Sequence, residues 1–340
     1  MEKKKYTFSQ KTTSYYFDTE FNYLDQLVDR AHTIIVTDEN IFRLHKKKLT
    51  GWNTIVLKPG EQFKVQATVD DVVQQLIAYK ADRKSHLIGI GGGVTTDITG
   101  YAASVYMRGI AFGFMPVSLL AMVDASIGGK NGIDVGVYKN FVGTIRQPDF
   151  LLYDISFLKT LPQAEWANGF AEIIKHACIK DARLFRELEQ NNVAHYKKNN
   201  DAAGKLIRRN AVIKSNVVLA DEFEQGERKL LNFGHTWGHA VETKLSIPHG
   251  HAVAIGMVMA CKLSEKLTGF KQTQRVVDLL KQYGLPVHAG VNKKEVFEVL
   301  KMDKKKDKAT MNYVLLNDIG KAIIKTIPFD ELENLISNEN

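Results

Sequence analysis

The sequence has few cysteines and no long apolar segment. Its two cysteines, Cys178 and Cys261, lie far apart in no paired pattern, which argues against a secreted disulfide scaffold and suits a reducing cytoplasm. No stretch approaches the roughly 20 apolar residues of a transmembrane helix. The N-terminal MEKKKYTF has no apolar run after its charges, so we expect no secretory signal peptide. These absences indicate a globular cytoplasmic protein.

The sequence also shows no internal repeat, no low-complexity linker and no nucleic-acid-binding pattern. Its net charge is +8, but the lysines are scattered, and the densest run, KMDKKKDK at 301–308, contains two aspartates. Aromatic residues do not interleave with basic ones as they do in RNA-binding sheets. A solvated basic surface or an anionic small-molecule substrate therefore explains the charge better than nucleic acid does.

With 340 residues the chain is long for a single domain, so two domains are expected. Its first half alternates strand and helix. Strand-like runs occur at 33–37, 53–57, 86–90 and 111–117, and helical patterns at 69–79 and 94–106. Such alternation predicts a mostly parallel sheet covered by helices. Ligands of these sheets bind beyond the carboxyl ends of the strands.

The second half is dominated by helical periodicity. Helical patterns cover 163–178, 202–219, 234–245, 252–267 and 273–283, and the next strand-like run is at 311–316. We therefore predict an α/β domain with a mostly parallel Rossmann-like sheet at 1–157 and an all-α domain at 158–340. A cleft between two such domains is the usual place for an active site.

A glycine-rich turn, GGGVTTD at 91–97, follows a predicted strand and opens a predicted helix. Glycines let a phosphate approach the backbone, and a helix N-terminus offers free N–H groups. The pattern is not G-x-G-x-x-G, so it does not support a standard Rossmann assignment, and a turn without a nucleotide remains an alternative. Asp38 and Asn40 end the first strand, where they suit either ribose hydroxyls or an ordinary loop.

Four of the ten histidines, His235, His239, His249 and His251, lie close together in the sequence. His235 and His239 are one helical turn apart, and imidazole is a preferred zinc ligand. The segment HTWGH lacks the glutamate of the H-E-x-x-H zinc-protease motif. Spacing alone would make both helix histidines ligands, and a surface or core-capping cluster is the alternative.

Glu172, in NGFAEIIKHACI, is a third candidate ligand because a carboxylate among apolar residues needs a partner. Spacing alone favours a structural salt bridge with Lys175 on the same helix face. Lys130 and Lys139 suit phosphate or carboxylate contact, or equally a solvated loop. Arg108 stands where a predicted helix ends, so it equally suits the helix dipole.

Taken in order, several segments resemble the 3-dehydroquinate synthase family over nearly the whole chain. They are PGEQFK (59–64), GIGGGVTTDITGYAASVYMRG (89–109), SLLAMVDASIGGKNG (118–132), KNFVG (139–143), LPQAEWANGFAEIIKHA (161–177), ERKLLNFGHTWGHAVE (227–242), HGHAVAIGM (249–257), YGLP (283–286) and MDKK (302–305). Their order and compatible spacing make the resemblance specific.

The resemblance implies an N-terminal NAD-binding domain and a C-terminal metal-binding domain. It implies Glu172, His235 and His249 as ligands of zinc or cobalt, with His239 facing the substrate. The implied NAD contacts are Asp38, Asn40, Glu61, Lys64, Gly92, Gly93, Val94, Asp97, Ser118 and Lys139, with Thr160 nearby. The implied substrate contacts are Arg108, Lys130, Asn140, Lys175, Lys214, Arg228, Asn232 and Lys304, with Asp124 beside the nicotinamide and substrate.

The implied enzyme is a homodimer that converts 3-deoxy-D-arabino-heptulosonate 7-phosphate to 3-dehydroquinate and phosphate in the shikimate pathway. Transient oxidation by NAD would precede phosphate elimination, re-reduction and aldol closure. His239 would shuttle a proton, since imidazole titrates near neutral pH, and Asn232 would orient hydroxyls. The alternatives are a cyclitol-forming sugar phosphate cyclase, a metal-dependent alcohol or glycerol dehydrogenase, and a non-catalytic homologue.

Three positions depart from the family pattern. Val117 replaces a threonine near the cofactor, and Gly136-Val137-Tyr138 replaces proline-leucine-glycine. His251 replaces the glutamate usual after His249-Gly250. We expect His251 to alter the surroundings of the metal or to compete as a ligand.

Overall fold

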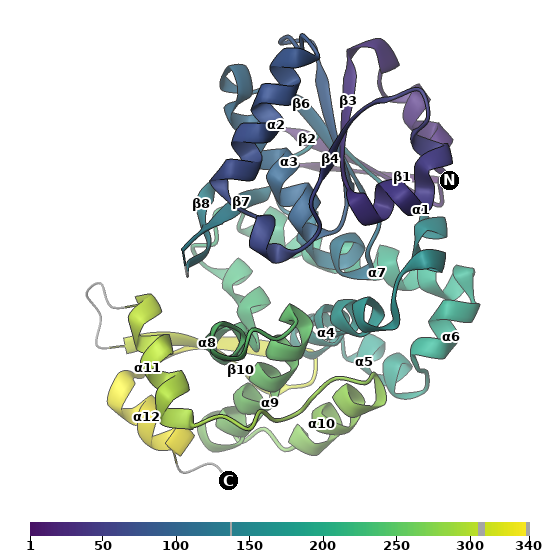
Figure 1. Cartoon of the computed structure of the whole chain (residues 1–340). Helices are drawn as coiled ribbons and strands as arrows, with labels where there is room; N and C mark the ends of the chain where they lie inside the picture. The colour runs from purple at the N-terminus through teal and green to yellow at the C-terminus, as the bar shows by residue number, and fades with distance from the viewer. Residues whose placement is uncertain (137, 305–309, 338–340) are drawn as a thin grey trace. The chain divides into compact units, whose positions relative to one another are not determined.

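The computed structural model describes residues 1–136, 138–304 and 310–337 and divides into two compact units (Figure 1). The first unit comprises Met1–Pro162 and Asn199–Phe223, and the second comprises Gln163–Lys198 and Glu224–Asn340. This division differs from the predicted boundary at 157/158, because Asn199–Phe223 returns to the first unit. Helical periodicity shows that this segment is a helix, but it does not show which neighbours the helix buries its apolar face against.

The first unit contains a seven-stranded sheet in the order β1-β2-β9-β6-β5-β3-β4. Its strands are β1 (Glu2–Thr7), β2 (Thr12–Phe17), β3 (Thr33–Asp38), β4 (Asn53–Leu57), β5 (His86–Gly91), β6 (Ala111–Pro116) and β9 (Phe150–Leu152). Strand β1 pairs antiparallel with β2, and the other pairs are parallel. The predicted mostly parallel sheet is confirmed.

The central strands are apolar along their length because helices cover both faces of the sheet. Ile34, Ile35 and Val36 on β3 are at most 3% exposed. Such continuous apolar runs are typical of parallel strands buried on both sides. The helices of this unit are α1 (Glu39–Leu49), α2 (Gln66–Ala78), α3 (Gly93–Val105) and α7 (Asn200–Ala220). Helix α7 is tied to β2 by a hydrogen bond of 3.1 Å between Ser215 Oγ and the Tyr15 hydroxyl.

A separate hairpin, β7 (Lys130–Val135) and β8 (Tyr138–Ile145), also belongs to the first unit. Its two backbones approach closely, since a Cβ on Gly143 would collide with the backbone of Asn131 and Gly132. The sequence analysis did not predict these strands, because their glycines and polar residues obscure the alternation expected of a strand.

The second unit is mainly helical. Its helices are α4 (Gln163–Lys180), α5 (Ala182–Glu189), α6 (Val193–Lys198), α8 (His235–Leu245), α9 (His249–Thr268), α10 (Thr273–Gln282), α11 (Lys293–Lys304) and α12 (Phe329–Ser337). The prediction of an all-α domain is wrong in one respect, because β10 (Thr310–Asp318) and β11 (Lys321–Pro328) form an antiparallel hairpin. That hairpin joins the helical core, where Leu316 N donates to Ser264 Oγ on α9.

Helix α4 runs through the interior of the second unit. All its residues from Trp166 to Ile179 are buried. A helix that is apolar nearly all round is a buried one, so a charged residue on it requires a specific partner. None of the helices among the described residues combines the length and apolar character needed to cross a membrane.

Candidate active site

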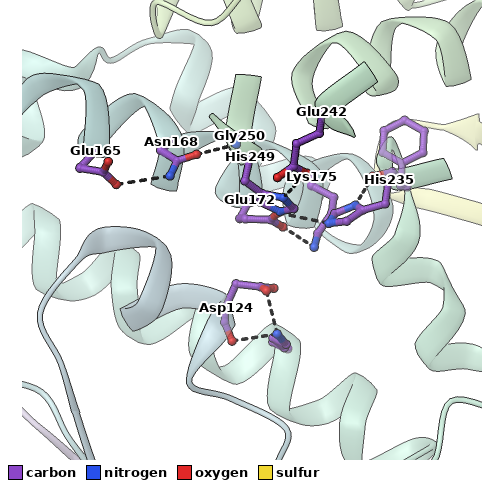
Figure 2. A network of polar contacts seen from close by, with 11 residues as sticks. Asp124, Glu165, Asn168, Glu172, Lys175, His235, Glu242, His249 and Gly250 are labelled. Atoms are coloured by element: carbon purple, nitrogen blue, oxygen red, sulfur yellow. Dashed lines mark hydrogen bonds and ion pairs between the residues drawn. The ribbon is translucent and has the colours of Figure 1, made fainter. Parts of the chain in front are cut away.

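Three side chains from three helices converge in the second unit. Glu172 lies on α4, whereas His235 and His249 are the first residues of α8 and α9. Their ligand atoms all lie within 4.8 Å of one another. Figure 2 shows both imidazoles turned toward Glu172, whose Oε1 is 3.4 Å from His235 Nε2 and 3.3 Å from His249 Nε2.

The close crossing of α8 and α9 brings the two histidines together. Gly234, which precedes α8, has φ +81, and a Cβ there would lie 2.7 Å from Val253 O. A Cβ on Gly238 would lie 2.8 Å from Ala252 O. Only glycine permits the left-handed turn and this close contact of two backbones.

In His235 and His249, the ring nitrogen that does not face Glu172, Nδ1, is hydrogen-bonded to an acceptor. His235 Nδ1 donates to Phe233 O at 3.2 Å, and His249 Nδ1 donates to Glu242 Oε2 at 3.2 Å. Because a carbonyl and a carboxylate only accept, Nδ1 of each ring carries a proton, and Nε2 of each ring faces Glu172 Oε1. The carboxylate oxygen and the two Nε2 atoms thus face one another, and a cation placed among them could bridge all three.

The electrostatics of this cluster favour a cation. Glu172 is fully buried and ion-paired with Lys175. Burial would raise the pKa of the Glu172 carboxyl, but Lys175 and His235 hold it well below its usual range. Burial would lower the pKa of His249, but Glu172 and Glu242 raise it to about 9. Two imidazoles and one carboxylate are also the donor set that zinc or cobalt accepts, so these residues fit a divalent metal ion.

His239 and His251 occupy different positions from the three converging residues. His239 is exposed, and it forms a second candidate group with Glu242 and His249, whose ligand atoms also lie within 4.8 Å. His251 joins none of the metal-ligating groups found among the described residues. Burial lowers the pKa of His251, and the nearby charge of Glu165 partly offsets this.

Glu242 is predicted to control the affinity for metal, because it would orient His249, one of the three candidate ligands. Glu242→Ala should weaken zinc binding about 10–100-fold, the usual effect of losing an outer partner of a metal-ligating histidine. Competition with a chromophoric chelator measures this. Glu295→Ala, which removes an exposed ion pair with Lys244 on the same helix, is the control and should leave the affinity unchanged. Equal affinities in both variants would contradict the assigned role.

Three further residues of the second unit were predicted to bind the substrate: Arg228, Asn232 and Lys304. The first two lie in the short helix that precedes α8. Arg228 is 3% exposed in the short helix Glu227–Asn232. Asn232 Nδ2 donates to Glu224 Oε1 at 2.7 Å. Lys304 is the last residue of α11, and its side chain lies outside the described residues.

Asp124 and Lys214 are joined in the first unit, although they are far apart in sequence. Lys214 Nζ lies 2.8 Å from Asp124 Oδ2 and donates to Asp124 O at 2.8 Å. Asp124 lies on a single π-helical turn, Ala121–Ala125, a distortion often found at functional sites. Helix α7 therefore brings a lysine of the predicted second domain to an aspartate of the first unit.

The carboxyl edge of the sheet gathers several predicted NAD contacts. Register pairs Val36 of β3 with Gly89 of β5, so Asp38 and Gly91 end neighbouring strands. The strand order reverses between these parallel strands, since β4 is added on one side of β3, and β5 and then β6 are added on the other. Such a switch point is where open α/β sheets bind ligands. Gly92, Gly93 and Val94 open α3 there, and Ser118 follows β6.

Asp38 has a structural role that does not depend on a nucleotide. Its Oδ1 accepts from Asn40 N at 2.9 Å and from Ile41 N at 3.0 Å, so it caps α1. Thr160 lies farther along the chain and its Oγ1 is 2.9 Å from His45 Nε2. These contacts leave the ribose role of Asp38 a prediction.

The buried Lys64 lies at the centre of a cluster of polar side chains. Its Nζ is 2.5 Å from Asp97 Oδ2, 3.8 Å from Glu61 Oε1 and 2.5 Å from Asn140 Oδ1. Burial alone would lower the pKa of Lys64, but Asp97 and Glu61 more than offset it, so its pKa lies above its usual value. The structure thus joins four predicted site residues from three segments of the chain.

Two further predicted residues have unusual backbone conformations. Arg108 has φ +65 directly after Met107 at φ +48, and Asn140 has φ +52. Left-handed conformations of non-glycine residues are costly and cluster at functional sites. Arg108, Lys130, Lys139 and Asn140 are all exposed in the first unit.

The sequence analysis missed Glu242 and Asn168. Glu242 lies two turns after His235 on α8, and Asn168 lies one turn before Glu172 on α4, so each shares a helix face with a ligand. That periodicity was the available signal, but many residues satisfy it without contacting a ligand.

Comparison with known proteins gives consistent matches along the chain. The family model described as 3-dehydroquinate synthase N-terminal matches residues 54–168, and the one described as 3-dehydroquinate synthase C-terminal matches residues 169–306. The 3-dehydroquinate synthase of Campylobacter curvus (strain 525.92) is 40% identical over 323 residues, which cover 92% of each chain.

Solved structures show the same architecture. The 2-epi-5-epi-valiolone synthase of Streptomyces hygroscopicus subsp. jinggangensis 5008, with NAD⁺ and Zn²⁺ bound, is 28% identical with a TM-score of 0.88 over 97% of both chains. A 2-deoxy-scyllo-inosose synthase complexed with carbaglucose-6-phosphate, NAD⁺ and Co²⁺ shares the fold, with a TM-score of 0.87 over 100% of both chains and 22% identity.

Proposed function

This chain belongs to the 3-dehydroquinate synthase family, and on that premise we propose that Glu172, His235 and His249 hold a divalent metal ion for the reaction. The reaction converts 3-deoxy-D-arabino-heptulosonate 7-phosphate to 3-dehydroquinate and phosphate, a step of the shikimate pathway. The observation that carries the proposal is that Glu172 Oε1 lies close to Nε2 of both His235 and His249. The Nδ1 atom of each of these rings is fixed by a hydrogen bond to a neighbouring acceptor.

Each residue of this centre has a distinct task. The bound ion would supply Lewis acidity to a substrate oxygen. Glu172 contributes negative charge. Phe233 O and Glu242 fix the rings of His235 and His249 by hydrogen bonds, so that both Nε2 atoms would face the ion. His239, exposed beside these ligands, would exchange a proton with a substrate hydroxyl. Asn232 would orient substrate hydroxyls by hydrogen bonding.

The first unit would bind NAD, which supplies a hydride acceptor that is restored within each turnover. The switch-point edge with Asp38, Gly92, Gly93 and Ser118 supports this, because α3 begins there with free N–H groups. The remaining proposed contacts are Asn40, Glu61, Lys64, Val94, Asp97, Lys139 and Thr160.

Cations would bind the phosphate and carboxylate of the substrate. The proposed set is Arg108, Lys130, Lys175, Lys214, Arg228 and Lys304, with Asn140, whereas Asp124 would lie beside the nicotinamide and the substrate. Arg108 and Asn140 also have a left-handed backbone, a costly conformation that is found more often than average at functional sites. Orientation and charge stabilisation by such groups account for most of the expected rate enhancement.

Phosphate release tests the proposal directly. With catalytic NAD, the protein should release phosphate from 3-deoxy-D-arabino-heptulosonate 7-phosphate, lose activity after chelator treatment and regain it with zinc. NADH should not accumulate, because the hydride returns to the product. Chelator-resistant release would contradict the metal assignment. NADH accumulating with a polyol would instead indicate a dehydrogenase, and release from another sugar phosphate would indicate a cyclitol synthase.

We also propose a homodimer in a reducing, cytoplasmic location. The β7–β8 hairpin supports the first part, because Tyr138, Phe141 and Val142 on β8 are at least 36% exposed, and exposed apolar edge strands are usually covered. Analytical ultracentrifugation should give twice the 38.3 kDa chain mass, and a monomer would contradict it. Cys178 and Cys261, both free and buried, suit a reducing compartment.

A further inference from the structure

The side chain of Asn168 on α4 binds the backbone of the first turn of α9. Its Oδ1 accepts a hydrogen bond from Gly250 N at 2.5 Å, and its Nδ2 donates to Glu165 Oε2 at 3.3 Å (Figure 2). The opposite orientation of the amide would set an NH₂ group against an N–H donor, so the two partners together determine it. Asn168 is only 9% exposed, so water competes little for these bonds.

Gly250 makes the contact between the two helices very close. A Cβ at this position would lie 2.6 Å from Asn168 O and 2.8 Å from Asn168 Cα, which are backbone atoms and cannot rotate away. The N-cap of α9, Pro248, makes no side-chain cap hydrogen bond. Asn168 therefore supplies from α4 a cap that the sequence of α9 itself does not contain.

Both partners of this contact adjoin proposed metal ligands. Asn168 precedes Glu172 by one turn of α4, and Gly250 directly follows His249. We propose that Asn168 is a positioning residue that keeps His249 in register with Glu172, so that the 3.3 Å approach of Nε2 to Oε1 is maintained. This inference rests on the proposed metal ligands and adds to them a residue that does not itself touch the metal.

The test measures metal binding rather than turnover. Asn168→Ala is expected to lower zinc affinity about 10–100-fold, the usual loss for an outer partner. It should also change the visible absorption bands of the Co²⁺-loaded protein, which report ligand geometry. The double variant Asn168→Asp with Glu165→Gln, here called the reversed pair, exchanges donor and acceptor between the two side chains. The new carboxylate at position 168 still accepts from Gly250 N and also accepts from the new amide at position 165. The reversed pair should recover most of the zinc affinity and the original Co²⁺ bands.

Ser264→Ala is the matched control, because Ser264 Oγ accepts from Leu316 N at 2.9 Å elsewhere on α9. Loss of that buried bond should lower the melting temperature and leave the Co²⁺ bands unchanged. Native zinc affinity and native Co²⁺ bands in Asn168→Ala would overturn the inference. If Asn168→Ala does not fold, Asn168→Leu, which keeps the volume of the side chain but removes the acceptor for Gly250 N, decides, since unchanged bands in that variant would also overturn the inference.

His249→Ala, measured alongside, separates the inference from the proposed function. Native metal affinity in His249→Ala would show that the proposed ligands are wrong. Loss of metal in His249→Ala, with native binding in Asn168→Ala, would overturn only the positioning role. Weakened binding in both, with recovery in the reversed pair, would support both claims.

Discussion

Glu172→Gln is expected to abolish turnover, remove stoichiometric zinc and lower the free energy of unfolding of the metal-free protein by about 3–5 kcal/mol. Glu172 has two roles under this proposal, since its carboxylate is the anionic member of the proposed metal-binding group and also the counter-charge of Lys175. Both residues are at most 1% exposed, so the Lys175 ammonium would lose this charge in a site that water does not reach. Urea unfolding in chelator measures the stability without metal.

The double variant Glu172→Gln with Lys175→Met separates the two effects. Removing both charges should restore much of the stability, because replacing a buried ion pair by apolar groups is often neutral. Zinc binding should stay lost, because the carboxylate ligand is still missing. Stoichiometric zinc of native affinity in Glu172→Gln would contradict the ligand assignment. A double variant as unstable as the single one would show that the ion pair does not cause the loss.

Lys64→Met is expected to destabilise the first unit by about 3 kcal/mol, at the lower end for a broken buried ion pair. Its ammonium balances Asp97 and Glu61, and the Lys64 side chain is only 5% exposed. Asp97 retains 17% exposure, so water partly compensates the charge that is left behind. Under the proposed function NAD affinity should fall as well, which isothermal titration calorimetry measures alongside urea unfolding.

Two further variants test the cause. Lys64→Met with Asp97→Asn removes the uncompensated carboxylate and should recover stability, whereas NAD affinity should not recover, because both residues are proposed contacts. Lys58→Met, on an exposed lysine that lies 5.5 Å from the Phe63 ring, is the matched control and should change stability by less than about 0.5 kcal/mol. A Lys64→Met protein as stable as this control would contradict the importance of the cluster.

Several elements could be predicted because their signals are local. The apolar runs of β3 to β6 and the periodicity of α2, α3, α4, α8, α9 and α10 depend only on neighbouring residues, and the structure places these elements at the predicted positions. The strands β1, β2 and β9 were missed. In β1 and β2, lysine, threonine and tyrosine give a weak apolar pattern, and β9 has only three residues.

The sequence by itself determined the class of chemistry, through the types and order of its motif residues: a carboxylate and histidines suited to a metal ion, and a glycine turn at a strand end suited to a nucleotide. Spacing alone left His235 and His239 equivalent and favoured a simple salt bridge for Glu172. The family resemblance implied His249 with His235, but only the tertiary structure gives the physical reason, because the glycine-mediated crossing of α8 and α9 brings together residues whose proximity no local period encodes.

The same reason explains the other differences. Helix α7 joins the first unit, Lys214 reaches Asp124, and Asn168 caps a helix more than 80 positions away. Hydrophobic periodicity specifies which face of an element is buried, but not the partner that buries it. That choice is made by packing among all the elements at once, and it decides which polar side chains become neighbours.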